Sequence, residues 1–253
     1  MEKDTPTTLA STNRYEVRLA KSTADLRASQ SLRYRVFNLE MGEGLEKSHN
    51  NELDVDDYDP QCDHLLVIEQ KTDTVIGTYR MQTYEKARRH QGFYTDDEFE
   101  LATLPSDLFE QSVEVGRACI ANEHRNGRVL YLLWRGIAEY MKLTESRYLF
   151  GCCSISSTSP EDGWIVMDYL RNNDYMHESY YLDTHKSFNC PETARAEDAW
   201  TSIELPELFD LYLGLGAKVL SKPALDTDFK TIDFLIIVDV EQLDERSRTL
   251  FFK

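Results

Sequence analysis

A charged pair interrupts an apolar run in the segment Ser112-Val-Glu-Val-Gly-Arg-Ala-Cys-Ile-Ala-Asn-Glu-His-Arg-Asn-Gly-Arg128. Residues 113–120 have the character of a buried strand, yet Glu114 and Arg117 lie within them. Taking a carboxylate or a guanidinium out of water costs several kcal/mol unless the charge is paired. We therefore expect either a buried ion pair or a functional site at these two positions.

A helix start follows this strand. The turn His124-Arg-Asn-Gly-Arg128 leads into residues 129–140, whose apolar side chains recur at helical spacing. A helix N-terminus that follows a strand and is flanked by arginine is suited to hold an anion. The segment therefore predicts a strand, an anion-binding turn and a helix.

The composition is that of an ordinary globular protein. The chain has 253 residues, of which 41% are hydrophobic, enough for one large domain or two closely joined halves. No stretch approaches the roughly 20 apolar residues of a membrane span, and the N-terminus does not resemble a signal peptide, so we expect a cytoplasmic protein. The formal net charge of −17 disfavours nucleic-acid binding.

The cysteines favour neither disulfides nor a metal. Five cysteines without CxxC spacing are typical of reduced thiols. Cys62 and His64 are the nearest approach to a ligand cluster, and they lack a second pair. We therefore expect no metal site. A covalent cysteine mechanism is also disfavoured, because no histidine-containing activation motif accompanies Cys119 or the Cys152-Cys153 pair.

Hydrophobic periodicity predicts alternating strands and helices. Residues 1–13 are Thr/Ser-rich and are expected to be a disordered lead-in. The acidic stretch 42–62 is expected to be a long loop, a length more common in binding lids than in passive connectors. Strands are expected at 15–20, 64–69, 74–83, 113–120, 148–154 and within 229–240, and helices at 22–37, 128–143 and 159–173. This order predicts a mixed α/β sheet with helices on both sides.

Five local patterns, in their order and spacing, resemble the GNAT acyltransferase fold. Within it, the chain is similar to bacterial N-acyltransferases that use acyl carrier protein donors, namely the ornithine lipid enzymes and N-acyl amino acid synthases, and more distantly to acyl-homoserine-lactone synthases. The patterns are Leu32-Arg-Tyr-Arg-Val-Phe37, the acidic run ending in Cys62-Asp-His-Leu-Leu-Val67, Gly77-Thr-Tyr-Arg80, Val113-Glu-Val-Gly-Arg117 with Leu133-Trp-Arg-Gly-Ile-Ala138, and Leu213-Gly-Leu-Gly-Ala-Lys-Val219 with Pro223-Ala-Leu-Asp-Thr-Asp-Phe229. The resemblance implies a single GNAT-like domain over residues 14–253 with a C-terminal extension.

The resemblance also implies a reaction. The amine of an amino acid, with ornithine the leading acceptor, attacks the thioester of a long-chain or 3-hydroxyacyl group on acyl carrier protein, without a cofactor. Glu114 is then the expected general base, and Arg117 either orients it or holds the acceptor carboxylate. Side chains alternate along a strand, so positions 114 and 117 reach one cleft only if a β-bulge lies between them. GNAT folds have such a bulge, and its free amide, here expected within residues 117–120, is the usual oxyanion donor.

The remaining site residues carried over from the family fall into two groups. The acceptor side of the cleft and its lid are expected to use Arg33, Phe37, Asp54, Asp57 and Arg80. Arg33 and Arg80 have an alternative interpretation, in which they only tie the acidic loop to the sheet. The donor side is expected to use Arg125, Asn126, Gly127, Arg128 and Arg135. This turn has a single glycine, unlike the Gly-rich loop of coenzyme A users, which favours a carrier-protein donor. Arg128 and Arg135 lie two turns apart on one helix face and are expected to steer that acidic partner.

Two further functions stay open at this point. One is an acyl-homoserine-lactone-type signal synthase, and the other is a non-catalytic module that binds acyl chains or carrier protein. A peripheral contact with the inner membrane is compatible with an acyl-lipid product. A binding module has no need of Glu114, so that residue separates catalysis from binding.

Overall fold

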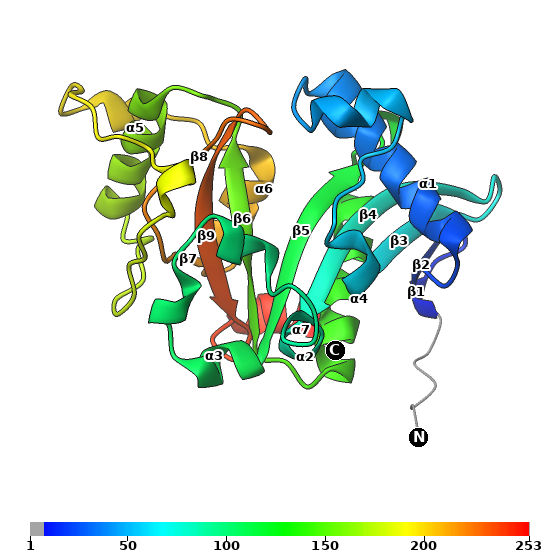
Figure 1. Cartoon of the computed structure of the whole chain (residues 1–253). Helices are drawn as coiled ribbons and strands as arrows, with labels where there is room; N and C mark the ends of the chain where they lie inside the picture. Colours follow the sequence, from blue (N-terminus) through cyan, green and yellow to red (C-terminus); the bar gives the residue numbers. More distant parts are fainter. Residues whose placement is uncertain (1–7, 253) are drawn as a thin grey trace.

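The computed structural model describes residues 8–252, and residues 1–7 and 253 lie outside this description. The strands form one nine-stranded sheet in the order β1-β2-β3-β4-β5-β6-β9-β7, with β8 paired to β9 (Figure 1). The strands are β1 (Thr8–Ser11), β2 (Tyr15–Leu19), β3 (Asp63–Glu69), β4 (Thr74–Thr83), β5 (Ser112–Ile120), β6 (Tyr148–Ile155), β7 (Lys218–Val219), β8 (Ala224–Asp226) and β9 (Thr231–Asp239).

Helices cover both faces of this sheet. Figure 1 shows α1 in front of the strands and α4 behind them, and both helices contact β4 and β5. The α-helices are α1 (Thr23–Tyr34), α2 (Tyr84–Ala87), α3 (Ser106–Glu110), α4 (Gly127–Leu143), α5 (Pro160–Asn172), α6 (Glu207–Gly214) and α7 (Glu245–Phe252). No helix within residues 8–252 is both long and apolar enough to cross a bilayer.

Local chemistry explains the element that leads into the site. Ser22 accepts a hydrogen bond from the Asp25 amide, and the Asp25 side chain accepts one in return, so a capping box starts α1. The helix then widens into a π-helix at Arg35–Glu40. Such π-segments inside helices occur frequently at functional sites.

The single parallel pairing in the sheet joins β5 to β6. It covers only Ser112–Glu114 against Tyr148–Phe150, after which the two strands separate (Figure 1). At the next position of β6, a Cβ on Gly151 would lie 2.2 Å from the carbonyl oxygen of Val115. Glycine therefore lets β6 pass close to β5 at the point where their pairing ends.

The predicted elements are confirmed with small shifts in their bounds. The hairpin of β3 and β4, the strand at β5 and the helix at α4 appear where the periodicity placed them. Residues 42–62 are irregular apart from short 3-10 turns at Glu46–Asn50 and Asp59–Gln61, as expected for a loop.

The lead-in is a correction. Thr8–Ser11 forms a strand that pairs with β2, so the expectation of disorder is wrong for these residues. Residues 1–7 of the same expected segment lie outside the described part of the chain. The strand was missed because its polar composition hides the edge pairing that orders it.

Candidate active site

A cavity of about 240 Å³ lies where β5 and β6 separate. Residues 114–118 of β5 and 149–154 of β6 line it, together with parts of β4, the π-helix and α6. The cavity therefore occupies the gap left by the lost strand pairing.

The two faces of the sheet give this cavity two chemically different ends. Because side chains alternate along a strand, Arg80, Gln82 and Glu114 face one side, whereas Tyr79 and Met81 face the other. The second side continues into the apolar core, and there the lining residues are Tyr79, Met81, Val115, Cys153, Phe209, Tyr212 and Ile236. The cavity thus joins a charged face to an apolar one.

A β-bulge brings Arg117 to the same face as Glu114. The register of β4 with β5 shifts between Thr78 and Arg80, so that Tyr79 opposes two residues of β5. Arg117 has a φ of 51°, a left-handed conformation that a side chain other than glycine adopts rarely. The predicted bulge is confirmed, and both charged residues line one cavity.

Glu114 is held by hydrogen bonds rather than by a cation. Its Oε1 accepts from the Thr95 amide and hydroxyl, each at 2.8 Å, and its Oε2 accepts from the Tyr94 amide at 3.0 Å. Burial raises the pKa of Glu114, and these hydrogen bonds oppose part of the rise. Glu114 and Arg117 do not pair with each other: Arg117 pairs with Asp54 and Asp56, and Glu114 is a positioned carboxylate of raised basicity.

Arg33 anchors the acidic loop inside the protein. Its Nε donates to Asp54 Oδ2 at 2.7 Å, and its Nη1 donates to Asp59 Oδ1 at 2.8 Å. Arg33 and Asp54 are fully buried and neither lines the cavity. Neither residue is therefore on the wall of this cavity, and Arg33 ties the acidic loop to α1 rather than to the sheet.

Arg80 and Arg117 share Asp56. Arg80 Nη1 donates to Asp56 Oδ1 at 2.6 Å, and Arg117 Nη2 donates to Asp56 Oδ2 at 3.1 Å. Burial alone would raise the pKa of Asp56, but the two guanidinium groups lower it below its ordinary value. Asp57, which sequence reasoning chose instead, is exposed and is not part of this network. The one-residue error arises because Asp56 and Asp57 are indistinguishable by composition.

Phe37, Arg80 and Tyr94 line the cavity from different elements. Phe37 lies on the π-helix and Arg80 lies on β4. The ring of Tyr94, which sequence reasoning missed, lies with its centroid 5.4 Å from the Arg80 guanidinium carbon and 5.0 Å from that of Arg117. Tyr94 therefore contributes a wall between the arginines and the rest of the cavity.

The turn before α4 is organised mainly by its own hydrogen bonds. Asn126 is the N-cap, and its side-chain oxygen accepts from the amides of Arg128 and Val129 at 3.1 and 3.2 Å. Arg125 pairs with Glu40 of the π-helix, with Nη2 donating to Oε2 at 2.8 Å. Gly127 and Arg128 are exposed at the helix start. These contacts give Asn126 and Arg125 structural roles that do not test their predicted contact with a donor.

Arg135 lies farther along α4. It pairs with Glu139 at 3.6 Å and borders a surface groove beside α7. Its predicted role in steering a partner stays a prediction.

The cysteine and histidine side chains have ordinary partners. Cys62 Sγ donates to Gln82 Oε1 at 3.1 Å, and His64 Nε2 lies 3.0 Å from the Asp59 carbonyl oxygen. Burial raises the pKa of the Cys119 thiol to about 12, so the thiol is not a ready nucleophile.

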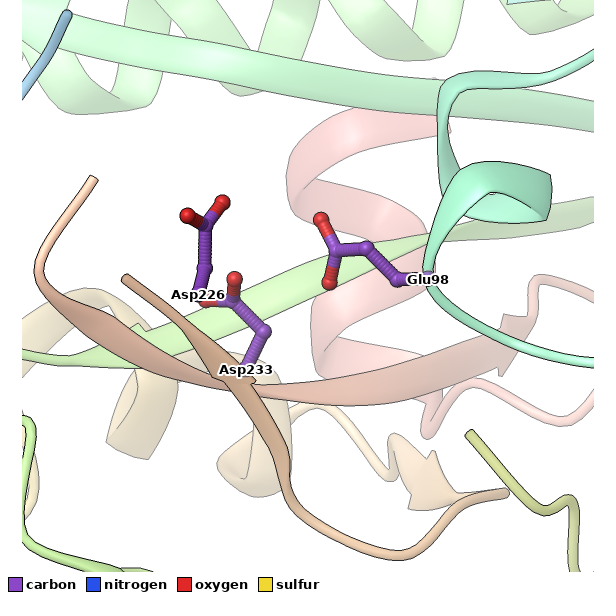
Figure 2. A group of neighbouring side chains, drawn as sticks. All are labelled: Glu98, Asp226 and Asp233. Carbon is purple, nitrogen blue, oxygen red and sulfur yellow. The ribbon is translucent and has the colours of Figure 1, made fainter. Parts of the chain in front are cut away.

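Three more carboxylates lie next to the charged face of the cavity but do not line it, and the sequence did not identify them as a group. Glu98, Asp226 and Asp233 converge so that one oxygen of each lies within 4.8 Å of the others (Figure 2). They come from the β4–β5 connection, β8 and β9. We call them the carboxylate cluster. The sequence contains only weak signals for two of them, the acidic run at 96–100 for Glu98 and the motif at 223–229 for Asp226. Chain folding alone brings the three residues together.

Comparison with known proteins connects this site with a chemistry. A family model described as "Acetyltransferase (GNAT) domain" matches residues 32–135, which include the bulged strand and the start of α4. An L-ornithine Nα-acyltransferase of Rhodobacter capsulatus is 31% identical over 245 residues, with 94% of each chain covered. The enzyme of that name from Rhizobium meliloti is 31% identical over 244 residues, covering 91% of this chain and 82% of the relative.

Solved structures agree on the fold. A CoA-dependent acyl-homoserine lactone synthase with SAM and isopentyl-CoA superposes with a TM-score of 0.53 at 14% identity, covering 90% of this chain and 81% of the other. An N-acyl amino acid synthase from uncultured soil microbes has a TM-score of 0.55 at 12% identity, covering 92% and 95%. The fold and the full-length sequence similarity lead to one conclusion: the chain is an acyltransferase of the GNAT fold and belongs to the family of the L-ornithine Nα-acyltransferases.

Proposed function

We propose that this enzyme transfers a long-chain acyl or 3-hydroxyacyl group from the thioester of acyl carrier protein to the α-amine of ornithine. The observation that carries the proposal is the cavity between β5 and β6, which joins a charged face containing Glu114 to an apolar face. The names of the full-length relatives support ornithine as the acceptor.

The acceptor amine approaches on the charged face. Glu114 takes a proton from it, directly or through a water molecule, and burial favours this role because it raises the pKa of the carboxyl. The amine nitrogen then forms a bond to the thioester carbon. The developing oxyanion meets the backbone of the bulge at Arg117 and Ala118, the C–S bond breaks, and the leaving thiolate takes up the proton that Glu114 accepted from the nitrogen.

The apolar face suits the acyl chain. Tyr79, Phe209 and Tyr212 are buried and border the cavity on this side. Each buried methylene of an acyl chain gains about 0.8 kcal/mol, so a long chain binds here more tightly than an acetyl group. We therefore infer a preference for long acyl donors.

The donor is inferred from the turn before α4. The turn holds one glycine and two arginines, of which Arg128 is exposed. This arrangement suits the single phosphodiester of a phosphopantetheine arm, and Arg128 can attract an acidic carrier protein. A lipid-like product would also bring the enzyme to the membrane surface.

The signal-synthase alternative is weaker. The relatives that match along the whole chain at 31% identity are named ornithine acyltransferases, whereas the lactone synthase structure is 14% identical and supports the fold alone.

The test is an assay of the purified protein with long-chain acyl carrier protein and ornithine, read by mass spectrometry of the product and by release of free thiol. Glu114→Gln keeps the size of the side chain and removes the base, so we expect turnover to fall about 10²- to 10⁴-fold. Arg27→Gln, an exposed change on α1, serves as the folding and assay control. Near-full turnover of Glu114→Gln, with acylornithine still formed, contradicts the assignment of the base.

A further inference from the structure

We propose that the carboxylate cluster of Glu98, Asp226 and Asp233 binds the side-chain ammonium of a diamino-acid acceptor. This inference rests on the proposed function and assigns to it a second binding point, which selects the acceptor.

The cluster brings three buried carboxyl groups together without a partner cation. Glu98, Asp226 and Asp233 are 1%, 4% and 4% exposed. Within residues 8–252, no lysine, arginine or histidine forms an ion pair with any of them, and Arg117 attracts Asp226 and Asp233 only from a distance. A cation that enters the cluster therefore meets uncompensated charge.

The oxygens left without donors match an ammonium group. Glu98 Oε1 and Asp233 Oδ1 are buried and have no hydrogen-bond partner among the described residues. Asp226 Oδ1 accepts from the amides of Asp228 and Phe229, at 2.8 and 2.9 Å, which leaves its second oxygen. An alkylammonium has three N–H donors, one for each carboxylate, and Figure 2 shows the three groups pointing toward one space.

A divalent metal fits this arrangement less well. Calcium takes about 6–8 oxygen ligands and magnesium keeps an octahedral shell. The cluster offers few free oxygens, because Asp226 Oδ1 is occupied by backbone amides and Asp233 Oδ2 accepts from the Thr231 hydroxyl at 3.3 Å. An ammonium ion needs no more than the oxygens that remain.

The cluster lies next to the charged face of the cavity, in contact with residues that line it. Thr231 lines the cavity and contacts Asp233, and Cys152 lines it with its Sγ 3.7 Å from Glu98 Oε2. Ser154, which also lines it, is paired in register with Asp233. Thr231, Cys152 and Ser154 therefore connect the wall of the cavity to the cluster.

The base and the cluster are also neighbours. Tyr94 and Thr95, whose amides hold Glu114, belong to the 3-10 turn Tyr94–Asp97 that immediately precedes Glu98. Burial raises the pKa of the Cys152 thiol, and the nearby carboxylates of Glu98, Asp233 and Glu114 raise it further. An acceptor with its α-amine at Glu114 thus directs a short side chain toward the cluster.

The experiment compares two acceptors with the same carbon skeleton, L-ornithine and L-norvaline, which lacks the terminal amine. Kinetic constants for both are measured with the wild-type enzyme, Glu98→Gln, Asp233→Asn and the control Glu178→Gln, which removes one exposed negative charge outside the cluster. We expect each cluster variant to raise the KM for ornithine about 10- to 100-fold, the range for a lost hydrogen bond to a charged group. The KM for norvaline should stay the same, and the control should change neither constant.

Calorimetry gives a readout that does not depend on turnover. The pKa values of Glu98, Asp226 and Asp233 are raised, mainly by burial, so the cluster holds protons that an ammonium ion displaces. Ornithine binding near pH 6.5 should therefore release protons to the buffer in the wild-type enzyme, and norvaline binding should not. Loss of this release in Asp233→Asn supports the assignment.

Several outcomes overturn the inference. One is equal use of norvaline and ornithine by the wild-type enzyme, and another is an equal loss of both in the cluster variants, which marks a structural role. A third is activity that chelator removes and a divalent metal restores. In all three, N-acylation of an amino acid still supports the proposed function. If the wild-type enzyme acylates neither acceptor, the proposed function fails, and calorimetry with ornithine alone decides the cluster.

Discussion

Two groups of charged side chains are buried within reach of Tyr94, and they differ in charge balance. The first, which we call the arginine network, sets Arg33, Arg80 and Arg117 against Asp54, Asp56 and Asp59. The second is the carboxylate cluster, which has no cation among the described residues in ion-pair contact. Most members of both groups are buried, although Arg117 and Asp56 are partly exposed, so the main difference between the groups is the pairing of their charges.

The difference separates scaffolding from binding. Three guanidinium groups and three carboxylates neutralise one another and fix the loop 42–62 against the sheet. A neutral network of this kind has little left to offer a ligand. The carboxylate cluster is left unbalanced by the fold, and an unbalanced buried charge is more often found at a functional site.

Breaking the balanced group should have the largest effect on stability. Arg33→Met removes the cation that Asp54 and Asp59 share and leaves their charges buried, so we expect the free energy of unfolding to fall by about 3–5 kcal/mol. Urea unfolding followed by circular dichroism measures this. Arg27→Met, an exposed change on the same helix, should shift it by less than about 0.5 kcal/mol. A loss for Arg33→Met as small as that of the control contradicts the scaffold role.

Removing a charge from the carboxylate cluster should instead increase the free energy of unfolding at neutral and higher pH. Burial raises the pKa of Asp233 from its ordinary value of 3.8 to about 7. The folded protein therefore binds this proton more tightly than the unfolded chain, and the stability that the proton confers is lost as the pH rises through about 7. We expect the free energy of unfolding of Asp233→Asn to increase relative to that of the wild type as the pH rises from 4 to 8.

The gain at pH 8 should be on the order of 1 kcal/mol or more, since one pKa unit corresponds to about 1.4 kcal/mol. Thermal unfolding of both proteins across this pH range gives the difference. A difference that is flat with pH, or that falls as the pH rises, shows that the Asp233 carboxylate does not titrate as a buried, unpaired group.

The smallest effect is expected at Asp57. This carboxylate neighbours Asp56 in sequence but is exposed and outside the arginine network, so Asp57→Asn should change stability by less than about 0.5 kcal/mol. The KM for ornithine should also stay within twofold of the wild type by the product assay. A large rise in KM would restore Asp57 to the acceptor site and weaken the view that burial distinguishes these acids.

The sequence predicted most of the fold because its signals are local. Alternation in β5, the helical period of α4 and the hairpin residues between β3 and β4 each depend on neighbours in the chain. The bulge was also predictable, since Glu114 and Arg117 can share a face only if the alternation is broken. The edge strand Thr8–Ser11 was missed because its order comes from pairing with β2.

The site was predictable only in part. Glu114 and Arg117 could be identified because they are charged residues in an apolar strand. Phe37 and Arg80 line the cavity as expected. The choice of Asp57 over Asp56, and the omission of Asp59, reflect a loop whose side-chain directions no periodicity reveals. Glu98 is far in sequence from Asp226 and Asp233, so only the packing of the β4–β5 connection against β8 and β9 brings the three together.

The short parallel contact between β5 and β6 also has a mechanical consequence. Within the described sheet, the lobe of β1 to β5 is paired with the lobe of β6 to β9 over three residue positions only. Such a contact can act as a hinge, since a small rotation about it widens the wedge between the lobes without breaking the strand pairing inside either one. The seam between β5 and β6 is therefore the place where we expect a wide acyl chain to spread the sheet at the smallest loss of backbone pairing between the two lobes.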